Sequence, residues 1–87
     1  MAKSKEMTYE IFVTQKAEDD LKKFDPVVKK RIKNGLIKLS SNPRSFAKKL
    51  VGSNEYRFRV GSYRVVFDIQ GKNILILRIG HRREIYR

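Results

Sequence analysis

Three arginines, Arg57, Arg59 and Arg64, lie on either side of a Gly61-Ser62 pair, in a stretch where apolar residues alternate with polar ones. A glycine in the first position of a two-residue link is typical of a tight β-hairpin turn. In that hairpin Arg59 faces Arg64 across the ladder, and all three guanidiniums share one face of the sheet. A like-charge cross-strand pair disfavours a sheet, so the pair indicates an anion bound between the arginines, most naturally a phosphate. A solvated sheet face without a ligand is the alternative interpretation.

The C-terminal segment Gly80-His81-Arg82-Arg83-Glu84-Ile85-Tyr86 is basic and ends near an aromatic side chain. If it returns over the arginine-bearing face, Arg82 or Arg83 and the Tyr86 ring join the site. Basic groups interleaved with an aromatic ring suit RNA, because the charges hold the backbone and the ring stacks on an unstacked base. His81 could exchange a proton near neutral pH, although a phosphate contact is the simpler role beside two arginines. Packing of Tyr86 in the core is an equal alternative for that residue.

The net charge of +12, from 21 basic and 9 acidic side chains in 87 residues, predicts a polyanionic partner. Nucleic acid is the first candidate, an acidic protein the second and an anionic membrane surface the third. The basic excess concentrates in residues 44–87, which hold 11 basic and 3 acidic side chains, against 10 and 6 in residues 1–43. The charge is therefore concentrated in the part of the chain that is expected to form strands.

Several classes of site are excluded by composition. Without cysteine there is no disulfide framework, thiolate metal site or cysteine nucleophile, and a single histidine leaves no imidazole pair for zinc. No carboxylate cluster suits magnesium, so we expect neither a metal nor a cofactor. No apolar run approaches the ~18 residues of a membrane span, and no signal peptide is recognisable. The chain is therefore expected in the cytoplasm, with no membrane partner.

The hydrophobic pattern predicts a single small α+β domain over residues 9–87, preceded by a flexible leader at residues 1–8. The expected elements are a strand at Tyr9–Thr14, a helix capped by Thr14, a second helix from Asp25-Pro26 to about Ser40, and strands starting at Tyr56, Tyr63 and Asn73, with Gly80 ending the last strand. The helices form a hairpin, which Gly35 allows to close tightly, packed on one face of a mainly antiparallel four-stranded sheet. The apolar run Ile74–Leu77 predicts a central strand buried on both faces.

Two segments, YRFRVGSYRVVF at Tyr56–Phe67 and GHRREIY at Gly80–Tyr86, closely resemble the RelE family of toxin–antitoxin systems. The resemblance extends from about Tyr9 to the end of the chain. It implies a metal-independent, ribosome-dependent endoribonuclease that cleaves mRNA in the ribosomal A site, by attack of a 2′-hydroxyl on the adjacent phosphorus. It also implies a RelB-like antitoxin that covers the active face in a toxin–antitoxin hetero-oligomer.

The resemblance also assigns roles to individual residues. Arg64 matches an arginine that contacts the scissile phosphate, Arg82 a second catalytic arginine, and Tyr86 a tyrosine that stacks on the substrate base. Arg57 and Arg59 occupy positions where some members carry lysines, one of them a proposed general base.

The arginines at positions 57 and 59 leave the proton acceptor open, because arginine stays protonated and is a poor base. The candidates are His81, an unusually desolvated arginine, and a group of the ribosome or RNA. Around the catalytic set, Arg83 and Lys49 are expected to bind the substrate. The exposed basic residues of the second helix, Lys29, Lys30, Arg31 and Lys33, are expected to contact ribosomal RNA.

Two other functions stay open at this point. The first is a ParE-like toxin with the same fold, which inhibits DNA gyrase by binding and does not cleave RNA. Loss of the Arg64, Arg82 and Tyr86 set would favour it, and all three residues are present. The second is a non-catalytic RNA-binding module.

Overall fold

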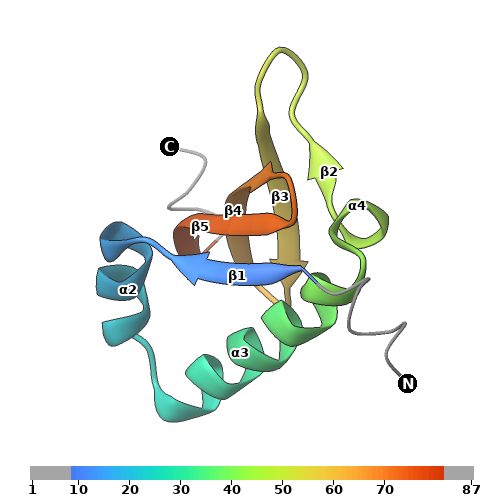
Figure 1. Cartoon of the computed structure of the whole chain (residues 1–87). Helices are drawn as coiled ribbons and strands as arrows, with labels where there is room; N and C mark the ends of the chain where they lie inside the picture. The colour runs from blue at the N-terminus through green and yellow to red at the C-terminus, as the bar shows by residue number, and fades with distance from the viewer. Residues whose placement is uncertain (1–8, 82–87) are drawn as a thin grey trace, which may run out of the picture.

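The computed structural model describes residues 9–81, which fold into a five-stranded sheet and three helices (Figure 1). The elements are β1 (Glu10–Val13), α2 (Gln15–Lys22), α3 (Pro26–Ser41), the single-turn α4 (Pro43–Phe46), β2 (Lys48–Lys49), β3 (Glu55–Val60), β4 (Tyr63–Gln70) and β5 (Asn73–His81). The expected leader at residues 1–8 and the segment 82–87 lie outside the described residues.

The strand order in the sheet is β1-β5-β4-β3-β2. The pairing of β1 with β5 is parallel and the other three pairings are antiparallel. The α+β class and the mainly antiparallel sheet are therefore confirmed. The sheet has one strand more than expected, because Lys48 and Lys49 add a two-residue strand beside β3.

The helix boundaries follow the capping residues in the sequence. Thr14 precedes α2 with extended backbone angles, and its Oγ1 accepts a hydrogen bond from the Ala17 N–H at 3.3 Å. Asp25 is the N-cap of α3 and Pro26 its first residue, as expected, although the Asp25 side chain makes no capping hydrogen bond. The predicted caps therefore mark both helix starts, and only one of them acts through its side chain.

The core lies between the helices and one face of the sheet. On the helices, Ala17, Ile32, Leu36 and Leu39 face this core and are at most 8% exposed. The strand side chains in this core are Phe58, Val65, Phe67, Ile74, Ile76 and Ile79, with Tyr56, Val60 and Tyr63 packed against them. The Tyr56 ring stacks on Phe67 with 5.4 Å between the ring centroids, so aromatic packing on the core side joins β3 to β4.

The two longer helices diverge from their link at residues 23–25, and Figure 1 shows them spread apart rather than lying along each other. Contrary to the expectation from the sequence, Gly35 therefore does not bring the two helices together. A Cβ at Gly35 would lie 2.9 Å from Val60 Cγ2 and 3.2 Å from Phe58 Cε2. The glycine therefore lets α3 approach β3, and it does not bring α3 close to α2.

A β-bulge in β5 decides which side chains of this strand face the core. Phe67 pairs with Ile76 but the preceding Val66 pairs with Arg78, so Leu77 is an extra residue on β5. The bulge turns both Ile76 and Ile79 toward the core, although they are three residues apart. The prediction of a central strand is confirmed, since β5 lies between β1 and β4. The expected burial on both faces is wrong, because Ile74 and Ile76 are buried whereas Leu75 and Leu77 are only partly buried.

Within residues 9–81, no helix has the length and apolar character needed to cross a membrane.

Candidate functional site

The hairpin of β3 and β4 has the register predicted from its turn. Arg59 pairs with Arg64, Arg57 with Val66, and Val60 with Tyr63. Gly61 has a φ of +60°, which a two-residue turn with glycine in first position requires. No non-glycine residue of the described chain has a positive φ. The neighbouring residues along both strands point into the core, so the three arginines share the opposite face of the sheet, called here the arginine face.

Lys48 adds a fourth cation to the arginine face, and sequence reasoning missed it. It pairs with Arg57 across β2 and β3, so the sheet carries a second like-charge cross-strand pair beside Arg59 and Arg64. The signal in the sequence was weak, because a two-residue strand has no alternation to recognise. The expected substrate-binding Lys49 pairs with Tyr56, which belongs to the core side.

These cations line a groove of about 650 Å³ at the β2 end of the sheet. The lining residues are Phe46, Lys48, Lys49, Leu50, Val51, Arg57, Arg59 and Arg64. None of the described residues that line it is acidic. Arg64 is half-buried, with its Nε shielded from solvent, whereas Arg59 is exposed. Guanidiniums held in this way form an anion-binding surface whose geometry suits a phosphate.

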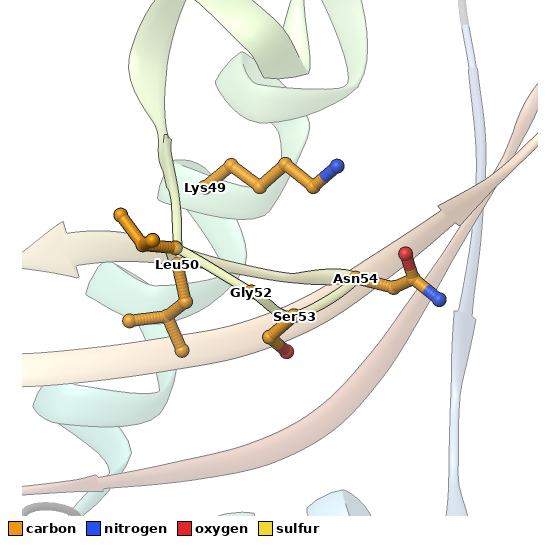
Figure 2. A pocket seen from close by; sticks show the side chains of 6 residues that line it. Lys49, Leu50, Gly52, Ser53 and Asn54 are labelled. Atoms are coloured by element: carbon orange, nitrogen blue, oxygen red, sulfur yellow. The ribbon is translucent and has the colours of Figure 1, made fainter.

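One wall of the groove is apolar and is formed by α4 and the loop between β2 and β3. Figure 1 shows this loop extending beyond the rest of the sheet, and Figure 2 shows Lys49 and Asn54 reaching to the same side of it. At its tip Val51 is fully exposed, and Phe46 on α4 is 40% exposed with the Lys38 ammonium 4.9 Å from its ring centroid. An exposed ring beside a cationic groove is an arrangement that can hold an unstacked base.

His81 does not join the arginines. It lies in β5, which continues past the predicted end at Gly80, and it pairs with Tyr63 on the core side of the sheet. Its ring packs edge-on against Tyr63 at 5.7 Å, and Tyr63 packs in the same way on Phe24 at 5.0 Å. Gly80 is the residue that pairs with Arg64. The bulge at Leu77 sets this outcome, because a shift of one residue exchanges the faces of every later side chain.

Helix α2 holds the bulged part of β5 from both of its ends. The Thr14 Oγ1 donates to the Ile76 carbonyl at 2.7 Å, just before the extra residue. The Asp20 carboxylate accepts from the Ile79 N–H at 2.9 Å and lies 3.4 Å from Arg78 Nε. Asp20 is only 6% exposed, so this carboxylate is buried against the strand. The placement of Gly80 opposite Arg64 therefore depends on α2.

The remaining predicted site residues fall in two groups. Lys29, Lys30, Arg31 and Lys33 are exposed on α3, whose buried stripe packs on the other face of the sheet from the arginines. They form a separate basic surface, called here the α3 surface. Arg82, Arg83 and Tyr86 lie outside the described residues. Among residues 9–81, no three His, Asp or Glu side chains come together as metal ligands would.

Comparison with known proteins gives matches over most of this chain. A family described as "ParE toxin of type II toxin-antitoxin system, parDE" matches residues 11–86. Toxin RelE3 of Methanocaldococcus jannaschii is 38% identical over 74 residues, which is 77% of this chain and 83% of the relative.

Solved structures show the same similarity. The RelBE2 toxin–antitoxin complex of Mycobacterium tuberculosis contains a chain with 28% identity and a TM-score of 0.81, over 86% of this chain and 99% of that one. A chain of the RelB–RelE complex of Methanococcus jannaschii has 32% identity and a TM-score of 0.71, over 86% of this chain and 94% of that one. The family match over residues 11–86 spans both the β3–β4 hairpin and the helices α2 and α3.

Proposed function

Because the chain belongs to the RelE/ParE superfamily of toxins of type II toxin–antitoxin systems, we propose that it is a ribosome-dependent endoribonuclease that cleaves mRNA in the ribosomal A site. The observation that carries this proposal is the groove on the arginine face. Two like-charge pairs lie there across neighbouring strands, Lys48 with Arg57 and Arg59 with Arg64. Such pairs destabilise an empty sheet and become favourable when a phosphate lies between them.

The chemistry proposed is attack by an RNA 2′-oxygen on the adjacent phosphorus, with departure of the 5′-oxygen. Negative charge accumulates on the phosphoryl oxygens in the transition state. Guanidiniums fixed on a sheet stabilise that charge without having to reorganise, an effect worth about 3–4 kcal/mol for a well-placed donor. Arg64 is the best placed of the three, because its Nε is shielded from solvent and its charge acts in a lower dielectric.

The requirement for the ribosome follows from geometry. Flexible mRNA seldom places its 2′-oxygen in line with the leaving oxygen, and an A site that fixes the backbone removes that entropic cost. In this proposal the α3 surface binds ribosomal RNA while the arginine face meets the message. The two basic surfaces lie on opposite sides of the core, so both can be occupied together.

The C-terminal residues complete the proposed site on the strength of the sequence resemblance. Arg82 is proposed as a second catalytic arginine, Arg83 as a backbone contact and Tyr86 as a ring that stacks on the base. All three follow directly from β5, whose last described residue is His81. Gly80, two residues before Arg82 in the sequence, pairs with Arg64.

The test is product analysis on programmed ribosomes. Purified protein is mixed with ribosomes carrying a defined A-site codon, and the new RNA ends are identified. We expect a 2′,3′-cyclic phosphate and a 5′-hydroxyl, with naked mRNA cut far more slowly. Ends carrying a 5′-phosphate, or equal cleavage of naked and ribosome-bound message, contradict the proposal.

The proposed regulator is a RelB-like antitoxin in a hetero-oligomer with this chain. Support comes from the relatives, since two of the similar structures are toxin–antitoxin complexes. A partner segment with acidic side chains complements the cationic groove and would exclude mRNA from it. Co-expression with a candidate antitoxin should yield a stable complex that no longer cleaves message on ribosomes.

A second candidate function is inhibition of DNA gyrase by binding, without RNA cleavage. It is favoured by the family that matches residues 11–86, which is described as a ParE toxin. A supercoiling assay with purified gyrase separates the two functions. Loss of supercoiling activity at a stoichiometric amount of this protein, together with intact mRNA on programmed ribosomes, selects the second function over the first.

A further inference from the structure

Under the proposed function, on which this inference rests, the groove on the arginine face needs a proton donor. When the P–O5′ bond breaks, the departing 5′-oxygen is a strongly basic alkoxide and needs a proton. Arginine is a poor source because it does not release its proton in proteins. His81 lies on the core side against Tyr63 and does not reach the groove. Among the described residues that line the groove, the side chains with a readily transferable proton are Lys48 and Lys49.

The register of β2 distinguishes these two lysines. Lys48 pairs with Arg57 and therefore lies on the arginine face. Lys49 pairs with Tyr56, whose ring stacks on Phe67 on the core side. Side chains alternate along a strand, so Lys48 is the one directed to the same side as the arginines.

The spacing of the strands suits proton transfer to a phosphate held by the arginines. Neighbouring strands lie ~4.8 Å apart, and Lys48 is level with Arg57 whereas Arg64 is level with Arg59, two residues further along β3. Lys48 on β2 and Arg64 on β4 are therefore ~12 Å apart on the sheet. Arg57 and Arg59 on β3 lie between them. A phosphate bound over β3 is therefore within reach of Arg64 from one side and of the Lys48 ammonium from the other.

We propose that Lys48 is the general acid that protonates the departing 5′-oxygen. The bond from the 2′-oxygen to phosphorus forms while the bond from phosphorus to the 5′-oxygen breaks. A Lys48 N–H bond breaks as the O5′–H bond forms, which leaves a neutral amine. Solvent water accepts the 2′-hydroxyl proton and later returns a proton to the amine. A lysine ammonium is a stronger acid than a guanidinium by about two to three orders of magnitude, so arginine does not replace it.

The test compares two leaving groups in otherwise identical ribosome-bound messages. One message has the normal 5′-oxygen at the cleaved linkage and the other has a bridging 5′-sulfur, whose thiolate leaves without protonation. The variant Lys48→Arg keeps the positive charge on an exposed strand and removes the better proton donor. Lys22→Arg, on the exposed part of α2, is the matched control. Unfolding midpoints of all proteins are measured first to establish that each variant is folded.

We expect Lys48→Arg to cleave the 5′-oxygen message about 10²-fold more slowly than wild type, within the range for loss of a general acid. It should cleave the 5′-sulfur message at the wild-type rate, and Lys22→Arg should match wild type on both. Equal slowing on both messages assigns Lys48 to binding alone and overturns the inference, as does an unchanged rate on the oxygen message. A sulfur-rescued defect in Lys49→Arg instead of Lys48→Arg also overturns it. If wild type cuts neither message, the proposed function itself fails, which is distinguishable from all these results.

Discussion

Arg59 and Arg64 lie directly opposite each other across the β3–β4 ladder, on the sheet face away from α2 and α3. Two guanidiniums in this position repel each other, and the repulsion opposes folding of the free protein. A bound phosphate converts the same pair into a two-sided clamp. If this pair binds a phosphate as proposed, removing one arginine should have opposite effects on folding and on function.

Arg64→Ala should slow cleavage of ribosome-bound mRNA by about 10²–10³-fold, if it supplies what one oxyanion-hole donor supplies. Its free energy of unfolding should stay the same or rise, because the repulsion by Arg59 is removed. Single-turnover cleavage and denaturant titration measure the two effects. Lys16→Ala on the exposed side of α2 is the control for charge loss alone. A folded Arg64→Ala protein with full activity would contradict the role proposed for this arginine. We expect Arg82→Ala to slow cleavage by a similar factor.

The α3 surface should determine affinity for the ribosome. Replacing its cations, Lys29, Lys30, Arg31 and Lys33, by glutamine should weaken ribosome binding and flatten its salt dependence, because fewer counterions are released on binding. The four side chains are exposed, so folding should be little affected. Binding measured over a range of salt concentrations gives the slope directly. An unchanged slope would mean that another surface contacts ribosomal RNA.

Gly35→Ala should destabilise the fold even though alanine is the better helix former by about 1 kcal/mol. The added Cβ would lie 2.9 Å from Val60 Cγ2 and 3.2 Å from Phe58 Cε2, and overpacking of this kind costs about 1–3 kcal/mol. Asn34→Ala on the exposed side of the same helix should be neutral or stabilising. Urea denaturation of both variants measures the difference. A more stable Gly35→Ala protein would show that α3 does not approach β3 this closely.

Asp20→Ala should lower the free energy of unfolding by about 1–3 kcal/mol, since the buried Ile79 N–H loses its acceptor. Asp19→Ala, one residue earlier, removes only an exposed hydrogen bond with Gln15 and should cost less than about 0.5 kcal/mol. Amide hydrogen exchange should show faster exchange at Ile79 in the first variant and not in the second. If both substitutions lower the free energy of unfolding equally, Asp20 does not hold β5 in the way described.

The sequence alone determined the hairpin and its pair of facing arginines, Arg59 and Arg64. Alternation from Tyr56 and a two-residue link beginning with Gly61 leave one register that buries the apolar side chains, and the observed pairing of Arg59 with Arg64 is that register. The helix starts were also predictable, because Thr14 and Asp25-Pro26 are local features that act without distant partners. The buried residues of α3, Ile32, Leu36 and Leu39, recur at the spacing of one helix face, which is a local pattern of the same kind.

Only the tertiary structure decided which other residues join the arginines. Lys48 enters the groove because β2 pairs with β3, and two residues carry too little pattern to predict that pairing. His81 points to the core side because one extra residue at Leu77 exchanges the two faces of β5. An apolar run such as Ile74–Leu77 satisfies either phase, so the choice falls to long-range contacts. Thr14 and Asp20 of the α2 segment supply those contacts by hydrogen-bonding the strand on each side of the bulge, about 60 residues away in sequence.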